Sequence, residues 1–555
     1  MKLAVLFLSL AIGSLANADS IELSINLSAT SSKPDARIKR GYVLQGAVAK
    51  TSDDYLDAIR KSKQLGNELV GIFRDINQFQ HNALFESYRS RGGTHFGANG
   101  EAEEFSLVDG AIQTRLNSQF LEMCRLARGG GMQIIFQLAG TPVEGLDDGS
   151  VRQLFTLDPN REYHGSARYY PIPVESEFDL YAETVADWAR KLVEATGASD
   201  AIWVGTQEPE HTLGFPGGVK TQEFRFTNLA DYTRLWKRLS DKLQAEGWLT
   251  GGMQNNAGAQ SGEKFLASID ALHANECSID FLTIQNYSGG DNERIIREAL
   301  EALNSKIGYE NAKILFHRYQ PSDLPSNTQF GTAEGVARIL QAEEVLFDHA
   351  NAIYGYCIHT AAKGHEMTEH LLAFLNSLPR MRKDVESDNE NLGAFAFADE
   401  EQVSVAIWNV GTESSDISLE LSGGSIAYPT IHVAHGSGKS QSPYAGYHWD
   451  AEIGLLDQIT LSPNEYLFIN LRKEEASHQS STPSPLSVRD LSYIGALNIE
   501  WRTVPGLLYE LQSSEDLHGF HWTSFQTPFF AWNDETSTLI SAPVNSRFFR
   551  IKAFQ

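Results

Sequence analysis

The stretch AIWVGTQEP, residues 201–209, decides the fold prediction. It starts as a short apolar run, ends in polar residues and closes on Pro209. A run of this length, bounded by turn residues, is typical of a strand that is buried on both faces. Seven other runs have the same character: GYVLQGAV (41–48), ELVGIFRD (68–75), MQIIFQLAG (132–140), WLTGGMQNN (248–256), DFLTIQNYS (280–288), KILFHRYQP (313–321) and AIYGYCIHT (352–360).

Amphipathic segments with helical periodicity separate these runs. They cover residues 55–65, 179–195, 229–245, 264–274, 293–305 and 333–349. Buried strands that alternate with helices predict a parallel sheet, and eight such units predict an α/β fold, a (β/α)8 TIM barrel over residues 40–385. A doubly wound open sheet is the alternative. That fold usually has a glycine-rich phosphate loop after its first strand, and Gln45-Gly46-Ala47 is no such loop.

The rest of the chain is rich in predicted strands. Residues 394–398, 403–410, 417–421 and 466–471 alternate with period two and predict a β-sandwich over residues 386–473. The same alternation within residues 19–39 predicts an N-terminal strand that joins the sandwich. Residues 474–489 are polar and rich in serine and proline, which indicates a linker. A small C-terminal β domain is expected over residues 490–555.

The first 18 residues have the pattern of a secretory signal peptide. Lys2 supplies a positive start, residues 3–15 are mostly apolar, and Ala16-Asn17-Ala18 is a cleavage site of small residues. The apolar run is shorter than the roughly 20 residues that a membrane-spanning helix needs. We therefore expect a secreted protein, extracellular or periplasmic, with no membrane span.

Charge and cysteine content exclude several classes of partner. The formal net charge is −26, and binding of nucleic acid requires a basic surface, so no nucleic-acid partner is expected. Cys124, Cys277 and Cys357 are scattered and no pair has the spacing of metal ligands, so we expect buried thiols, no metal and no cofactor.

Polar residues gather at the ends of the predicted barrel strands, where the loops of this fold form the active-site face. Amides, phenols, histidines and few carboxylates at one rim suit a polyhydroxylated ligand. The candidates are Arg74, Asp75, Gln137, Gln207, Glu208, Glu210, Asn255, Asn286, Tyr287, His317, Arg318, Tyr319 and His359.

Glu208 is the sharpest candidate among these residues. Pro209 stiffens the turn and biases residue 208 away from the α region. A carboxylate at the mouth of an apolar strand is partly desolvated, which raises its pKa and favours a general acid. The structural alternative is a carboxylate that braces the next loop.

Gln207-Glu208-Pro209 at the end of the fourth strand resembles the Asn-Glu-Pro signature of clan A glycoside hydrolases. The resemblance implies that Glu208 protonates the glycosidic oxygen and that Gln207 contacts the sugar 2-hydroxyl. Arg74 resembles the active-site arginine of the clan, and Tyr287 resembles the aromatic residue that closes the sugar subsite. The implied substrate is a polysaccharide or oligosaccharide. We interpret it as an algal glycan, either sulfated or unsulfated.

The domains outside the barrel extend the resemblance. A sandwich built partly from the N-terminus is similar to the xylosidase, iduronidase and agarase-type families of the clan. Residues 499–517 and 547–551 resemble a small C-terminal β module that is common in secreted proteins of Verrucomicrobia-like bacteria.

Strand seven departs from the pattern of the clan, whose nucleophilic glutamate ends that strand. Here residues 314–319 contain no carboxylate. Several schemes therefore stay open. The second carboxylate could be Asp75 or Glu210 facing Glu208, or an inverting enzyme could use Asp75 or Asp323 as the base. Other schemes make Glu208 the nucleophile with His317 as acid/base, an arrangement that resembles some fucanases, or make Tyr319 the nucleophile; in the last alternative the barrel only binds glycans. Since side chains alternate along a strand, His317 and Tyr319 share one face and Arg318 takes the other, unless a bulge intervenes.

Overall fold

The structure is a computed structural model, and it describes a large part of the chain. The described residues are 21–29, 31, 37–44, 52–75, 105–116, 118–139, 141–145, 151–156, 164–165, 168–169, 173–205, 229–257, 261–286, 291–321, 324, 326–359, 362–387, 389, 391–400, 402–423, 428–434, 440–441, 448–450, 454–472, 487–491, 496–502, 508–514, 523–524, 529–530, 535–541 and 548–554. The chain forms two compact units, residues 1–35 with 331–344 and 378–479, and residues 36–330 with 345–377 and 480–555.

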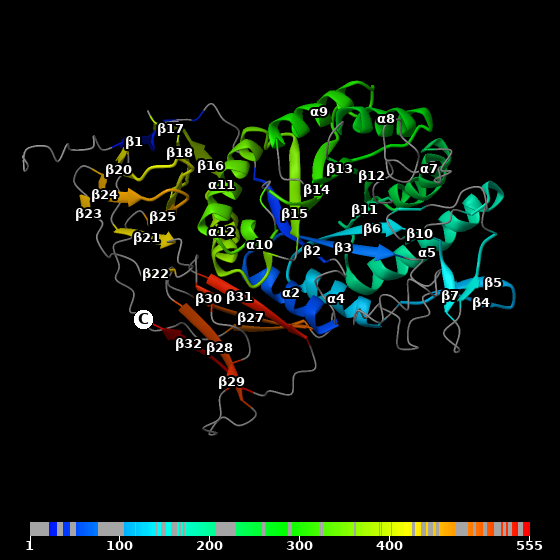
Figure 1. Ribbon diagram of the computed structural model, residues 1–555. Helices are drawn as coiled ribbons and strands as arrows, with labels where there is room; N and C mark the ends of the chain where they lie inside the picture. Colours follow the sequence, from blue (N-terminus) through cyan, green and yellow to red (C-terminus); the bar gives the residue numbers. More distant parts are fainter. Residues whose placement is uncertain are drawn as a thin grey trace, which may run out of the picture. The chain divides into compact units, whose positions relative to one another are not determined.

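Eight parallel strands close into a barrel in the second unit, in the order β11-β12-β13-β14-β15-β2-β3-β6 (Figure 1). Each strand arises from one of the eight apolar runs, so the predicted TIM barrel is confirmed. The strands are β2 (Lys39–Leu44), β3 (Leu69–Asp75), β6 (Gln133–Ala139), β11 (Ile202–Val204), β12 (Leu249–Asn256), β13 (Phe281–Asn286), β14 (Lys313–Tyr319) and β15 (Ile353–His359).

Helices alternate with these strands along the chain, as the periodicity predicts. They are α2 (Ser52–Gln64), α4 (Ser118–Gly129), α5 (Phe178–Thr196), α7 (Leu229–Ala245), α8 (Ser261–Ala274), α9 (Asn292–Asn304), α11 (Ala333–Asp348) and α12 (Glu366–Asn376), with the short η1 (Glu175–Glu177) and α10 (Ser326–Gln329). None of the described helices has the length and apolar character that spanning a bilayer requires.

Both faces of the barrel wall are buried, which explains why the strands are near-continuous apolar runs. The inner face holds a cluster of Val43, Leu69, Ile135, Ile202, Val204, Phe281, Leu315 and Cys357. On the other face, the Trp203 ring stacks on Phe136 at 4.7 Å and meets Trp188 of α5 at 6.3 Å. Alternate positions therefore identify the side chains that face the barrel interior.

A β-sandwich core lies in the first unit. One sheet has the order β17-β1-β20-β24-β23 and the other β16-β18-β19-β25-β21-β22. Leu23 of β1 is fully buried and lies opposite Leu419 of β20 in parallel register. The strands are β1 (Ile21–Asn26), β16 (Met381–Lys383), β17 (Val385–Ser387), β18 (Leu392–Ala398), β19 (Gln402–Asn409), β20 (Ser415–Ser422), β21 (Tyr428–Ala434), β22 (Ser440–Gln441), β23 (His448–Asp450), β24 (Leu455–Leu461) and β25 (Tyr466–Arg472).

The C-terminal residues form two small antiparallel sheets, β26-β27-β31 and β29-β28-β30 with β32 paired to β28. Their first strand begins at Ser487, inside the segment that the sequence assigns to the linker. The strands are β26 (Ser487–Leu491), β27 (Ala496–Arg502), β28 (Leu508–Ser514), β29 (Thr523–Ser524), β30 (Phe529–Phe530), β31 (Glu535–Ser541) and β32 (Phe548–Phe554). The expected signal peptide, residues 1–18, lies outside the described residues.

The two longest connections of the barrel carry short hairpins of their own. The connection after β3 contains β4 (Phe105–Val108) and β5 (Ala111–Thr114), and the one after β6 contains β7 (Val143–Gly145), β8 (Val151–Gln153), β9 (His164–Gly165) and β10 (Arg168–Tyr169).

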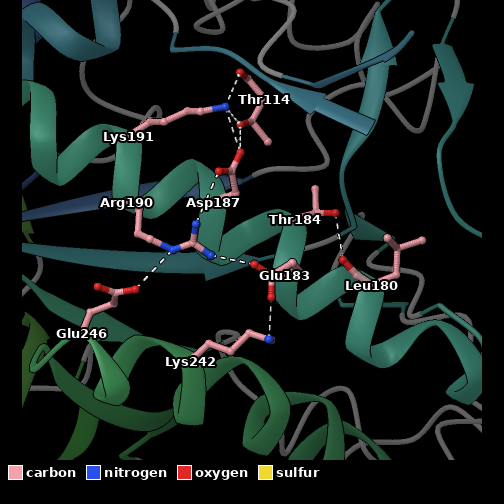
Figure 2. A network of polar contacts seen from close by, with 9 residues as sticks. All are labelled: Thr114, Leu180, Glu183, Thr184, Asp187, Arg190, Lys191, Lys242 and Glu246. Atoms are coloured by element: carbon pink, nitrogen blue, oxygen red, sulfur yellow. Dashed lines mark hydrogen bonds and ion pairs between the residues drawn. The ribbon is translucent and has the colours of Figure 1, made fainter. Parts of the chain in front are cut away.

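Polar contacts tie the β4–β5 hairpin to α5 (Figure 2). Lys191 Nζ donates to the carbonyl oxygen and to Oγ1 of Thr114, at 3.1 and 2.6 Å, and Thr114 Oγ1 donates to Asp187. Two ion pairs continue the network from α5 to α7 and the residue after it, Glu183–Lys242 at 2.5 Å and Arg190–Glu246 at 3.3 Å. The connection after β3 is thus anchored to the helical layer at its hairpin.

Candidate functional site

A β-bulge near the end of β14 places Arg318 on the inner face of the barrel, beside His317. Leu315 belongs to the inner cluster, so alternation places His317 on the inner face. The register then shifts, and Arg318 lies opposite Gln285 of β13. Gln285 is on the inner face because it lies four residues after Phe281, a member of the inner cluster. A bulge inserts one extra residue and re-aims the side chains beside it. His317 and Arg318 therefore both face the barrel interior, although they are adjacent in the sequence.

His317 reaches from β14 toward β3 through a gap left by a glycine. A Cβ atom placed on Gly71 would lie only 2.8 Å from His317 Nε2 and 3.3 Å from Val43 Cγ2. The imidazole has 0% of its surface exposed. Burial, and secondarily the charge of Arg318, hold the pKa of His317 well below its ordinary value of 6.5, so the imidazole is neutral near pH 7.

Arg318 lies between polar neighbours on the same inner face. Its guanidinium Nη1 donates to Gln285 Oε1 at 3.4 Å, and only 1% of its surface is exposed. His359, the last residue of β15, is partly buried, and burial together with the Arg318 charge lowers its pKa to about 4. The end of the barrel thus combines one buried cation with two neutral imidazoles and an amide.

Gln137 of β6 adds a second amide to the inner face. It lies two residues after Ile135 of the inner cluster and is fully buried. Neither Nε2 nor Oε1 of Gln137 has a hydrogen-bond partner within the described part of the structure. Such groups are costly to bury, so this amide is suited to a hydroxyl-bearing ligand that enters the barrel.

Three other sequence candidates point away from this inner group. Tyr319 packs on the outer side of β14, with its ring 5.2 Å from Phe316 and 4.9 Å from Tyr356. Asn255 accepts a hydrogen bond from Ser268 of α8, and Asn286 Nδ2 donates to Asn292 Oδ1 of α9 at 3.1 Å. The two asparagines thus contact helices outside the barrel, and Tyr319 packs against aromatic residues of β14 and β15.

Other candidates lie beyond what the structure describes. Gln207, Glu208, Glu210, Tyr287 and Asp323 are outside the described residues. Arg74 and Asp75 are the last two residues of β3, and only their backbone is described. Gly71, among the described residues, takes part without a signal in the sequence, because nothing in the run ELVGIFRD shows that a histidine of β14 fills the space beside it.

The two neutral histidines make stability sensitive to acid. An unfolded histidine binds its proton near pH 6.5, whereas His359 in the fold binds one only near pH 4. The unfolded state therefore binds more protons in this window, and stability falls as the pH drops from about 6.5 to 4. Thermal melting at pH 7 and pH 4.5 should show a smaller drop for His359→Gln than for the wild type. His273→Gln, an exposed position on α8, should leave the drop unchanged, and an equal drop in all three proteins would contradict the assignment.

The fold is shared with several carbohydrate-active proteins of known structure. The bacterial orthologue of human α-L-iduronidase is 13% identical with a TM-score of 0.59, over 96% of this chain and 97% of that one. A monomeric β-xylosidase from Caulobacter crescentus is 9% identical with a TM-score of 0.54, over 81% of this chain and 99% of that one. A glucosidase from Croceicoccus marinus is 12% identical with a TM-score of 0.53, over 82% of this chain and 100% of that one. The sequence matches no protein-family model and no curated protein. At these identities the similarity establishes the fold.

Proposed function

We propose that this chain is a secreted glycoside hydrolase that cleaves glycosidic bonds in an algal polysaccharide, with Glu208 as general acid/base and a sulfated chain as one form of the substrate. The observation that carries the proposal is the position of Gln207-Glu208-Pro209, three residues after β11 ends at Val204. That is the edge where barrels of this fold hold their active sites. The solved structures with the same fold have iduronidase, xylosidase and glucosidase in their names, which supports the reaction class.

Asp75 is our candidate for the second carboxylate. It ends β3, which is separated from β11 by β6 alone in the barrel order. Neighbouring strands lie about 4.8 Å apart, so β3 and β11 themselves lie roughly 10 Å apart. Inverting glycosidases hold their carboxyl groups about 6.5–9.5 Å apart, and retaining ones about 5–5.5 Å. The strand order therefore favours inversion, in which Glu208 protonates the leaving oxygen and Asp75 activates water.

Arg74, Gln207, Tyr287, Gln137 and Arg318 are proposed to hold the sugar in this scheme. The second candidate mechanism makes Glu208 the nucleophile and His317 the acid/base. The inward position of His317, two residues after Leu315 of the inner cluster, supports it. The lowered pKa of His317 opposes it, because a general acid has to carry a proton at the working pH. A barrel that only binds glycans is the non-catalytic alternative.

The proposal is tested by incubating the protein with a panel of neutral, uronic-acid-containing and sulfated polysaccharides. New reducing ends are expected on at least one of them, and NMR of the first product should show an inverted anomeric centre. A retained centre would reject Asp75 as the base of an inverting reaction and leave the retaining schemes, in which Glu208 is either the nucleophile or the acid/base opposite another nucleophile. Retardation in affinity electrophoresis without any new reducing end would reject hydrolysis and leave the binding alternative.

A further inference from the structure

Two glutamines of β6 face the barrel interior and differ in their hydrogen bonding. Gln133 and Gln137 lie two residues on either side of Ile135, a member of the inner cluster, so they share its face. The amide of Gln133 is paired at both atoms: Oε1 accepts from Lys39 Nζ at 3.0 Å, and Nε2 donates to the carbonyl oxygen of Asp200 at 2.6 Å. Gln137 is fully buried, and neither atom of its amide has a hydrogen-bond partner in the described part of the chain.

The unpaired amide lies toward the edge where barrels of this fold bind their ligands. Gln137 is two residues before β6 ends at Ala139, whereas Gln133 begins the strand. The carboxyl ends of barrel strands carry the functional groups, and the opposite ends contribute to stability. Burying polar atoms without partners is costly, so such atoms call for an explanation. Among the described residues, no other buried side-chain amide leaves both of its polar atoms unpaired.

A second unpaired neutral group lies on the same face of the barrel. The buried hydroxyl of Thr283 has no hydrogen-bond partner among the residues described, and it shares the inner face of Phe281 two residues earlier. A Cβ atom placed on Gly251 would lie 2.5 Å from Thr283 Oγ1 and 2.7 Å from Val204 Cγ1. Val204 in turn is paired with Gln137 in the register of β11 and β6. The amide and the hydroxyl therefore lie on opposite sides of Val204, and β12 contributes no side chain between them at Gly251.

The chemistry of these two groups matches a neutral polyol. An amide donates from its nitrogen and accepts at its oxygen, and a hydroxyl both donates and accepts. Two adjacent hydroxyls of a sugar pair with the amide completely, because one accepts from Nε2 while its neighbour donates to Oε1. A carboxylate or a sulfate ester has only acceptor oxygens, so one of them would face Oε1 without a hydrogen between them. Acidic substituents are therefore unfavourable beside Gln137.

We infer that Gln137 is a specificity-determining residue that receives two adjacent, unsubstituted hydroxyls of the glycan, and we call this position the diol subsite. The inference rests on the proposed function for the sugar that carries the hydroxyls. Thr283 offers one more neutral hydrogen-bonding group to the same glycan, and Val204 offers an apolar surface to its C–H groups. Any sulfate of the substrate then belongs at another position. Gln137 binds the sugar and takes no part in the proton transfer assigned to Glu208.

Gln137→Met tests the unpaired amide in the absence of any ligand. The thioether chain has nearly the same shape and no group that needs a hydrogen bond, so the free protein should melt at the parent temperature or higher. Gln133→Met, four residues earlier on the same strand, is the matched control. It removes an amide that is paired at both atoms, and the melting temperature should fall. A fall of equal size in Gln137→Met would show that the fold itself satisfies the amide, and would overturn the inference.

Defined oligosaccharides test the diol. The probes are tetrasaccharides of xylan, cellulose, agarose, alginate and fucoidan, each with its set of monodeoxy derivatives. Binding is measured by calorimetry in a Glu208→Gln background, so that hydrolysis does not consume the probe. For at least one tetrasaccharide, removal of either of two adjacent hydroxyls should weaken binding roughly tenfold to a hundredfold, because the buried amide is left half-paired.

The same probes in Gln137→Met show whether this amide is the partner. The intact tetrasaccharide should bind more weakly to Gln137→Met, and the same two deoxy positions should then change its binding by less than about threefold, since no amide remains to be left unpaired. Gln133→Met should keep the full sensitivity of the parent. Undiminished sensitivity in Gln137→Met overturns the diol subsite. So does a parent protein in which no pair of adjacent hydroxyls matters, including one that binds none of the tetrasaccharides.

The diol subsite and the hydrolase proposal fail separately. If binding depends on Gln137 while the protein with Glu208 intact produces no reducing ends, the diol subsite stands and hydrolysis is rejected. If the intact protein cleaves a polysaccharide and Gln137→Met cleaves it with unchanged kcat/KM, hydrolysis stands and the diol subsite is rejected.

Discussion

Glu208→Gln is expected to lower kcat roughly a thousandfold on the polysaccharide that the wild type cleaves, with KM changed by less than about threefold. The amide has the shape of the carboxyl group but can neither donate the proton to the leaving oxygen nor carry the charge. General acid/base catalysis by one positioned group typically contributes about 10²–10⁴-fold, which sets the size of the loss. Release of reducing ends, measured under saturating and limiting substrate, checks both parameters.

The leaving group distinguishes the acid role of Glu208 from that of a nucleophile. An aryl glycoside whose phenol is acidic needs little protonation, so Glu208→Gln should slow its cleavage far less than that of the polysaccharide if Glu208 is the acid. Loss of equal size on both substrates would assign Glu208 as the nucleophile. Glu210→Gln, two residues along the same connection, is the matched control and should retain activity within a few-fold. Turnover of Glu208→Gln within a few-fold of the wild type would exclude both roles.

The sequence was sufficient to predict the barrel because the physical signal is strong at that level. A parallel strand covered on both faces has to be apolar almost throughout, so each of the eight strands stands out as a run, and the helices between them show their own period. Trp203 and Phe136, neighbours on β11 and β6, illustrate this: each is fully buried on the outer face, while Ile202 and Ile135 beside them are buried on the inner face.

The arrangement of the site needed the structure, because it depends on a one-residue irregularity. Strict alternation along β14 would place His317 on the inner face of the barrel and Arg318 on the outer face. The bulge places both on the inner face. A bulge is set by the partners on both neighbouring strands, so no local pattern in KILFHRYQP reveals it. The same limit applies to Asn255: its place at a strand end suggested a ligand contact, and the structure pairs its side chain with Ser268 of the outer helix α8.

Gly71→Ala is expected to destabilise the protein by about 1–3 kcal/mol, the usual cost of adding a methyl group to a well-packed interior. The new Cβ would lie 2.8 Å from Nε2 and 2.9 Å from Cδ2 of His317, closer than real contacts allow. The imidazole is fully buried, so it cannot swing aside into solvent. Its displacement also shifts the bulge that aims Arg318, so we expect activity to fall with stability. Thermal melting and glycan hydrolysis measure the two effects.

The cause of that loss can be isolated with a double mutant. His317→Ala removes the atoms that the new methyl group strikes, so Gly71→Ala should cost much less in that background, with a coupling energy of roughly 0.5–3 kcal/mol. Gly252→Ala is the matched control, because its Cβ would lie 2.9 Å from Leu272 Cδ1 on the helix-facing side of β12. It should destabilise the protein as well, but by the same amount with and without His317. Equal coupling of both glycines to His317 would show that the imidazole does not occupy the space beside Gly71.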